Sequence, residues 1–197
     1  MESTDTLSDR IRAARHARRM TLDALAEASG VSRAALSKIE RGEASPTAAL
    51  LARLAAGLGT SVASLFAESG EGGEGGGAPL SRRADQPAWT DPQSGYVRRN
   101  VSPPAARGAA EIVDVTFPPG GRVVLDNAFG FHGIAQQVWL LEGSLELTIG
   151  GETTRLAAGD CLFVRLDAPI AFHNPGETPA RYAVVLSRLP ARGTPPA

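Results

Sequence analysis

The chain has 197 residues, a formal net charge of −1 and a hydrophobic fraction of 43%. This length suffices for two small domains or one larger one. No stretch approaches the ~20 apolar residues that a membrane helix needs, the N-terminus lacks the apolar run of a secretory signal, and a single cysteine, Cys161, excludes an intramolecular disulfide. These features predict a folded cytoplasmic protein that spans no membrane.

Charge is distributed unevenly along the chain. Residues 1–66 hold nine Arg and Lys against seven Asp and Glu, residues 67–80 hold three Glu and no basic residue, and residues 81–197 hold eleven of each sign. A positive excess confined to one segment is typical of the part of a protein that meets nucleic acid. Because the excess is small, we expect salt-sensitive binding that depends on specific contacts.

Residues 7–66 show the spacing of short amphipathic helices, and we expect five of them. The segment 21–42, TLDALAEASGVSRAALSKIERG, predicts two helices joined at Ser29-Gly30. Gly30 suits the joint because a helix C-cap often needs positive φ, and Ser32 can cap the next helix. Two helices joined by a tight turn with Gly are typical of the helix-turn-helix, whose second helix enters the DNA major groove. The pattern predicts DNA binding.

Further along, Ser45-Pro46 predicts the start of a fourth helix with Pro46 at its first position, and Ser61 predicts the cap of a fifth. Residues 67–87 are expected to form a flexible linker, because the stretch 68–79, ESGEGGEGGGAP, cannot bury a core. A Gly-rich coil of about twelve residues has an end-to-end distance of roughly 20 Å. The second domain should therefore be tied loosely to the first.

From about residue 88 the hydrophobic period changes from helical to alternating. Short alternating runs separated by Gly, Pro and Asn predict strands at 113–117, 137–141, 144–149, 153–156, 161–165, 169–173 and 180–187. Many short strands at regular spacing are typical of a sandwich or small barrel. Cys161, at the start of one run, is expected to be a small buried apolar residue.

Residues 11–66 resemble the Cro/C1 (XRE-type) helix-turn-helix family, through TLDALAEASGVSRAALSKIERGEASPT followed by LLARLAAGLGTSVASLF. The resemblance implies a five-helix domain that binds double-stranded operator DNA as a homodimer. It implies a buried pair between Arg15 of the first helix and Glu40 of the third. By position it also implies that the DNA contacts are made by Thr21, Ser32, Arg33, Ala34, Ser37, Lys38 and Arg41.

Residues 110–188 resemble the cupin superfamily of small β-barrels, through QQVWLLEGSLELTIGGETTRLAAGDCLFVRLDAPIAFHNPGETPARYAVVL. Metal-binding cupins show G-x5-H-x-H-x3-4-E-x6-G and then G-x5-P-x-G-x2-H-x3-N. In this chain Gly130 and His132 stand at the first two His positions, Gln136 at the Glu position and Ile170 at the last His position. An amide and an isoleucine cannot replace carboxylate and imidazole ligands, so we expect no metal and no other cofactor.

Without a metal, the barrel interior is expected to be an apolar pocket for a small organic ligand. His132 is equally well explained as a hydrogen-bonded structural histidine, and His173, out of phase with Ile170, should point away from the interior. Sequence alone does not decide which strand faces line the pocket. The candidate ligand-binding residues are Phe131, His132, Gln136, Val138 and Trp139.

The two resemblances together are those of bacterial one-component transcription regulators. They imply a multidomain α + β chain with a helix-turn-helix domain at 7–66, a linker at 67–87 and a cupin domain at 88–190. We expect a dimeric, sequence-specific DNA-binding regulator whose cupin domain senses an unknown small-molecule effector.

Two other functions stay open. One is a metal-dependent cupin enzyme, similar to an epoxidase or dioxygenase, that carries a helix-turn-helix-like domain. Its two-His, one-carboxylate iron site would have to use His132, Gln136 and Ile170, and two of these three residues are not ligands. The other is an antitoxin-like or scaffold protein that acts mainly through a protein partner.

Overall fold

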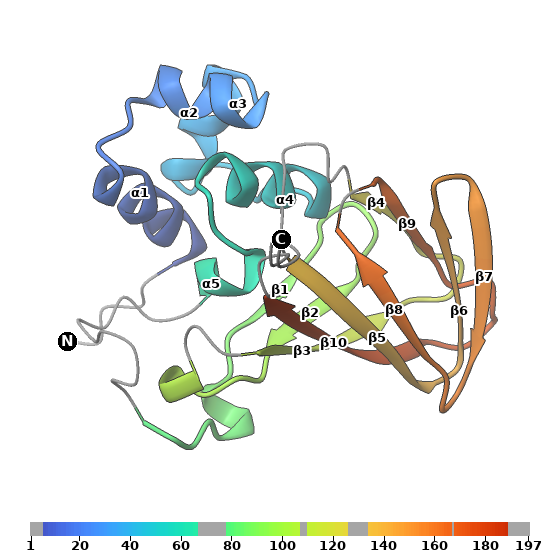
Figure 1. Ribbon diagram of the computed structural model, residues 1–197. Helices are drawn as coiled ribbons and strands as arrows, with labels where there is room; N and C mark the ends of the chain where they lie inside the picture. The colour runs from blue at the N-terminus through green and yellow to red at the C-terminus, as the bar shows by residue number, and fades with distance from the viewer. Residues whose placement is uncertain (1–5, 67–77, 107–109, 126–133, 167, 189–197) are drawn as a thin grey trace, which may run out of the picture.

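The computed structural model describes residues 6–66, 78–106, 110–125, 134–166 and 168–188. Helices gather at one end of the molecule and strands at the other (Figure 1). The helices are α1 (Leu7–Ala17), α2 (Leu22–Ser29), α3 (Arg33–Glu40), α4 (Ala48–Gly57) and α5 (Val62–Phe66). The predicted division into a helical N-terminal region and a β-rich C-terminal region is confirmed. No helix in the described ranges combines the length and apolar character that crossing a membrane requires.

Hydroxyl side chains begin the helices. Each of the first four has a Ser or Thr N-cap whose side chain accepts from the backbone N–H three residues on: Thr6, Thr21, Ser32 and Thr47. Gly30 ends α2 in the left-handed region with φ of 61°. The predicted roles of Gly30 and Ser32 are confirmed. The predicted start of the fourth helix at Pro46 is wrong, because the Thr47 hydroxyl provides the cap and α4 begins at Ala48, two residues later.

Close approach of α2 and α4 fixes the helical core. A Cβ added to Gly57 of α4 would lie 2.9 Å from the backbone nitrogen of Ser29, so only glycine leaves room for this crossing. Ile11, Leu25 and Leu36 are fully buried between the helices. The helical domain thus has its own hydrophobic core, which holds α3 against the others.

The strands form two antiparallel sheets. The six-stranded sheet has the order β1-β2-β3-β10-β5-β8 and the four-stranded sheet the order β4-β9-β6-β7. Their bounds are β1 (Ala88–Thr90), β2 (Val97–Asn100), β3 (Glu111–Phe117), β4 (Arg122–Leu125), β5 (Ile134–Glu142), β6 (Ser144–Ile149), β7 (Glu152–Ala157), β8 (Cys161–Arg165), β9 (Ile170–His173) and β10 (Ala180–Arg188). Short 3-10 helices lie at Arg83–Asp85 and Pro104–Ala106.

The sheets face each other without closing into one hydrogen-bonded barrel in the described residues. Side chains join them instead: the rings of Phe172 on β9 and Tyr182 on β10 stack with centroids 5.9 Å apart. This differs from the expected closed barrel, although the interior between the sheets is apolar. Residues 78–87, within the predicted linker, contact the larger sheet through Pro87, whose carbonyl accepts from the Asn100 N–H of β2, and the Ala78 carbonyl accepts from the Ala105 N–H of a 3-10 helix.

Sequence predictions were made for two residues that lie on the outer surface, Cys161 and His173. Cys161 is exposed, so the prediction of a buried cysteine is wrong. It lies on β8, an edge strand, at a position paired with Trp139, and both side chains are on the outer face of the sheet. His173 is confirmed as pointing away from the interior, since it alternates with buried Phe172 and contacts Glu146.

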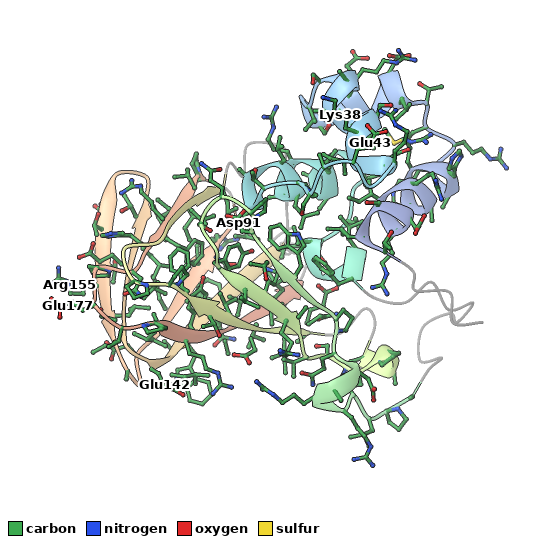
Figure 2. All side chains as sticks on the ribbon, turned by 180° about the vertical axis from the view of Figure 1, so that it is seen from behind. Lys38, Glu43, Asp91, Glu142, Arg155 and Glu177 are labelled. Atoms are coloured by element: carbon green, nitrogen blue, oxygen red, sulfur yellow. The ribbon has the colours of Figure 1, made fainter. Side chains whose placement is uncertain are left out.

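The helical region packs directly against the strands. The Ala48 N–H at the start of α4 donates to Asp91 Oδ1 at 3.1 Å, and the Trp89 indole N–H donates to Ser45 Oγ at 3.2 Å. The ring centroids of Phe66 and Trp89 lie 6.4 Å apart. Figure 2 shows Asp91 where the helices meet the sheets. The two regions are therefore joined by specific contacts, whereas the Gly-rich stretch led us to expect a loose connection.

Candidate functional site

The exposed face of α3 is the candidate DNA interface. Ser32, Arg33, Ala34 and Lys38 are exposed and Ser37 is half-buried. Figure 2 shows Lys38 at the end of the helical domain that is remote from the sheets. The expected recognition residues therefore share one accessible surface that nothing else in the described chain covers.

The two arginines of this surface, Arg33 and Arg41, already have partners. Arg33 Nε lies 2.9 Å from Asp23 Oδ1, and both side chains are largely exposed. Arg41 donates through Nε and Nη2 to the two oxygens of Glu43, at 2.6 and 2.8 Å, and through Nη1 to Ser37 Oγ. These hydrogen bonds lower the pKa of the Glu43 carboxyl. Pairs this exposed are readily exchanged for other partners, so they hold the side chains in place without blocking DNA.

The Thr21 hydroxyl, expected to approach DNA, accepts the Ala24 N–H at 3.0 Å as the N-cap of α2. A capping hydroxyl is still able to donate its own proton. Thr21 is exposed beside the start of α2, so its expected role stays a prediction.

A buried ion pair fixes α3 relative to α1. Arg15 donates through Nε and Nη2 to the two carboxylate oxygens of Glu40, each at 2.7 Å, and through Nη1 to the Met20 carbonyl at 2.9 Å. The Glu40 hydrogen bonds raise the pKa of the Arg15 guanidinium, which keeps it charged. The expected Arg15–Glu40 pair is confirmed. It sets the angle at which α3 presents its exposed face.

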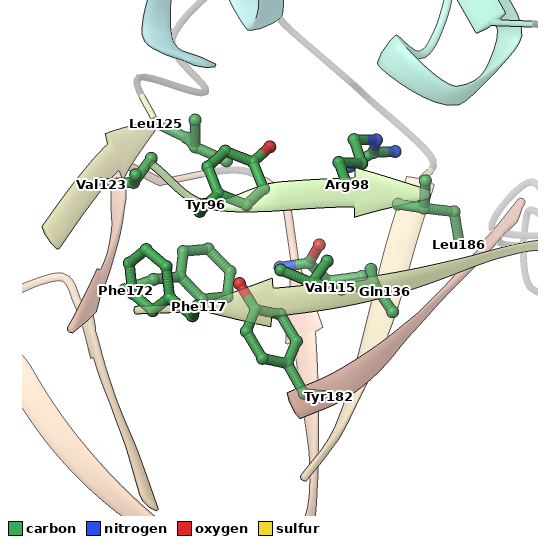
Figure 3. Close-up of a pocket in the computed structure, with 11 residues that line it drawn as sticks. Tyr96, Arg98, Val115, Phe117, Val123, Leu125, Gln136, Phe172, Tyr182 and Leu186 are labelled. Atoms are coloured by element: carbon green, nitrogen blue, oxygen red, sulfur yellow. The ribbon is translucent and has the colours of Figure 1, made fainter. Parts of the chain in front are cut away.

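A pocket opens into the space between the two sheets (Figure 3). Its lining is mostly apolar and aromatic, with Arg98 and Gln136 as polar exceptions. Tyr96 and Tyr182 are buried, and burial raises the pKa of both phenols, so both stay neutral at physiological pH. The described residues that line it are Tyr96, Arg98, Val115, Phe117, Val123, Leu125, Gln136, Phe172, Tyr182, Val184 and Leu186.

The structure brings only part of the expected ligand set to this pocket. Gln136 lines it. Val138 is fully buried on the same strand face but does not line the cavity, and Trp139 is 49% exposed on the opposite face. Phe131 and His132 lie outside the described residues.

Sequence reasoning missed Arg98 of β2, Tyr182 of β10 and Tyr96, which directly precedes β2. For Tyr182 the signal was present, because it alternates with the half-buried Arg181 and Ala183 in a strand that was predicted. For Arg98 no signal was available, since an arginine in a short polar segment ordinarily predicts a solvent-exposed position.

Two of the positions that hold metal ligands in metal-binding cupins can be compared with the side chains found there. Gln136 presents an amide to the pocket, and Ile170 is a fully buried apolar residue in the core. Within the described ranges, no group of three or more His, Cys, Asp or Glu is arranged to hold a metal ion.

Two families match separate parts of the chain. The helix-turn-helix family matches residues 11–65, and the cupin family matches residues 113–186. The chain carries a helix-turn-helix domain and a cupin domain. The exposed α3 is the second helix of the helix-turn-helix, and the pocket between the sheets lies in the cupin domain.

Three proteins are similar to this chain over most of its length. The HTH-type transcriptional regulator SutR of Escherichia coli (strain K12) is 27% identical over 172 residues, which are 87% of this chain and 88% of that protein. The crystal structure of an HTH_3 family transcriptional regulator from Vibrio cholerae has a TM-score of 0.75 and 25% identity, covering 93% of this chain and 96% of that one. Hydroxypropylphosphonic acid epoxidase from S. wedmorenis is 20% identical with a TM-score of 0.48, covering 91% and 95%.

Proposed function

We propose that this chain is a sequence-specific, DNA-binding transcriptional regulator whose cupin domain binds a small organic effector without a metal. The exposed face of α3 carries the proposal. It holds Arg33 and Lys38 at the end of the molecule away from the sheets, and the buried Arg15–Glu40 pair fixes its orientation. The match to the helix-turn-helix family and the similarity to two transcriptional regulators support it. Such a protein acts in the cytoplasm.

Replacement of Arg33 or Lys38 by Ala tests the DNA interface. Each variant should lose about 1–3 kcal/mol of binding free energy for a DNA site selected from random sequence, because each side chain can donate to a base edge or a phosphate. Fluorescence anisotropy at fixed salt measures the affinity. Arg122→Ala, which removes an exposed arginine of β4, is the matched control. Equal affinity of all three variants would show that α3 is not the recognition helix.

The Arg33–Asp23 pair allows a second test of opposite sign. Asp23→Asn removes the acidic partner 2.9 Å from Arg33 and one negative charge from the surface that meets DNA. DNA affinity should therefore rise, and the rise should shrink as salt increases. A loss of affinity would show that Asp23 holds Arg33 in the geometry that binding requires.

We further propose that the protein is a homodimer, joined through the outer face of β5 and β8. Trp139 and Phe163 are 49% and 55% exposed there, and β8 is the edge strand of its sheet. Antiparallel pairing of an edge strand with its own copy satisfies the two-fold symmetry that a palindromic operator requires. Trp139→Ser and Phe163→Ser should lower the mass measured by sedimentation equilibrium, whereas Val124→Ser, an exposed apolar residue of the other sheet, should not. An unchanged mass would place the contact elsewhere.

The hairpin of β1 and β2 connects the pocket to the helices. Tyr96 and Arg98 line the pocket, while Trp89 and Asp91 of the same hairpin contact the helical domain. A ligand that prefers one arrangement of this hairpin shifts DNA affinity by its differential binding to the two arrangements. The test is a ligand titration against operator affinity, and no change in affinity at saturation would refute effector sensing.

A further inference from the structure

The pocket contains three hydrogen-bond donors without an acceptor. Arg98 Nε, Arg98 Nη2 and Gln136 Nε2 are buried and have no hydrogen-bond partner in the described part of the chain. Gln136 is only 6% exposed. Leaving buried donors unsatisfied is unfavourable, most of all for those of a charged group. Buried donors that converge on a cavity therefore indicate the position of an acceptor supplied by a ligand.

The strand register explains why a guanidinium faces the interior. Arg98 of β2 is paired with Val115 of β3, whose side chain is buried between the sheets. Gln136 of β5 is paired with Leu186 of β10, which also lines the pocket. In Figure 3, Arg98 and Gln136 lie on the same side of the pocket as Leu186.

The Nε and Nη2 atoms of an arginine form one edge of the guanidinium, and this chain repeatedly uses that edge to bind a carboxylate. Arg15 donates from it to Glu40, Arg41 to Glu43, Arg155 to Glu146 and Arg181 to Asp114. The same two atoms of Arg98 are the ones without an acceptor. The planar fork matches the two oxygens of a carboxylate.

Charge and size define the rest of the ligand. Among the described residues that line the pocket, Arg98 is the one with a formal charge at neutral pH, since the raised pKa values of Tyr96 and Tyr182 keep them neutral. One guanidinium balances one negative charge. The cavity volume is about 50 Å³, and one water needs roughly 10–15 Å³. The cavity therefore accommodates a small acid and excludes a nucleotide.

The side of the pocket opposite the donors is apolar. Phe117, Phe172 and Val123 lie there (Figure 3), and besides Arg98 and Gln136 the polar groups of the described lining are the neutral hydroxyls of Tyr96 and Tyr182. We propose that the effector is a small monocarboxylate, whose carboxylate binds Arg98 and Gln136 and whose apolar body contacts Phe117 and Phe172. This proposal rests on the proposed sensory role of the cupin domain and specifies its ligand class.

Isothermal titration of the full-length chain with the straight-chain carboxylates from acetate to butyrate, which match a cavity of this volume, tests the proposal. At least one should bind at millimolar concentration, while its neutral amide and inorganic phosphate should bind at least about tenfold more weakly. Phosphate carries more charge than one guanidinium balances and lacks the apolar body. Failure of every carboxylate to bind, or equal binding of the amide, would overturn the proposal.

Variants of the donors supply the second readout. Arg98→Met and Gln136→Leu should weaken carboxylate binding, the first by about 10- to 100-fold, and Arg98→Lys should restore only part of it because the fork is lost. Arg122→Met is the matched control. Arg98→Met removes two buried donors, Nε and Nη2, that have no acceptor in the described part of the chain, so its melting temperature should not fall by more than the loss of the Arg98–Tyr96 hydrogen bond accounts for. Undiminished binding by Arg98→Met would refute the assignment.

DNA affinity measured with and without the same carboxylate separates this inference from the proposed function. Carboxylate binding without a change in DNA affinity would support the ligand class and refute effector sensing. A change in DNA affinity caused only by neutral or cationic compounds would refute the ligand class and support sensing.

Discussion

Truncation of Glu40 to Ala should destabilise the helical domain by about 3–5 kcal/mol. The carboxylate accepts two hydrogen bonds of 2.7 Å from Arg15, and the two side chains are only 9% and 6% exposed. Without Glu40 the Arg15 guanidinium stays buried and keeps only its contacts to the Met20 carbonyl and to His16. Breaking a buried pair by removing one partner typically costs this amount, because the remaining charge is uncompensated.

Urea unfolding followed by far-UV circular dichroism measures the loss. Glu43→Ala is the matched control. Glu43 accepts two hydrogen bonds from Arg41 Nε and Nη2 in the same bidentate geometry, but on the exposed surface, where the pair should contribute little to stability. The double variant Arg15→Met, Glu40→Leu removes both buried charges and should recover most of the stability. If Glu40→Ala loses no more than Glu43→Ala, the buried pair does not hold α3 in place.

Three further results are expected. Gly57→Ala should cost about 1–3 kcal/mol in the same urea assay, since its Cβ would lie 2.9 Å from Ser29, and no loss would show that α2 and α4 can separate. Tyr96 and Tyr182 are the chain's two tyrosines and burial raises the pKa of both, so the folded chain should show no tyrosinate absorbance near pH 10. Because the unfolded chain loses these protons first, stability should fall as pH rises above about 10. Lys38 is the single lysine, and operator DNA should protect it from reductive methylation, with labelling unchanged by DNA counting against the α3 interface.

Local signals in the sequence predicted most of the helical domain and the longer strands. Helix caps such as Ser32 and Gly30 are determined by the side chains and φ angles of adjacent residues. They can therefore be predicted without knowledge of contacts between distant parts of the chain. The predicted runs 144–149 and 161–165 coincide with β6 and β8, because alternation of apolar residues directly reflects one buried face.

The strands that were not predicted are short and lie beside the helices or the pocket. β1, β2 and β4 have three or four residues each, too few for a period of two to be recognised. Trp139 and Arg98 show that the face of a strand on which a side chain lies is also hard to predict. The candidate ligand-binding residues included Trp139 and did not include Arg98, whereas the strand register places Trp139 on the outer face and Arg98 opposite buried Val115. Which face of a strand is buried is decided by its partners across the sheet.

The connection between the domains was the least accessible to sequence reasoning, and it matters most for the mechanism. A Gly-rich stretch predicts independent motion, but Asp91 is 2% exposed and accepts the backbone N–H of Ala48 at the start of α4. A carboxylate at a helix N-terminus is favoured both by this hydrogen bond and by the helix dipole. Asp91 also accepts from the Ser94 N–H within its own turn, which leads directly to Tyr96 of the pocket. A change in the pocket that moves this turn must therefore either move α4 with it or break the Asp91–Ala48 contact. The six residues from Asp91 to Tyr96 are thus the route through which the proposed effector sensing would act.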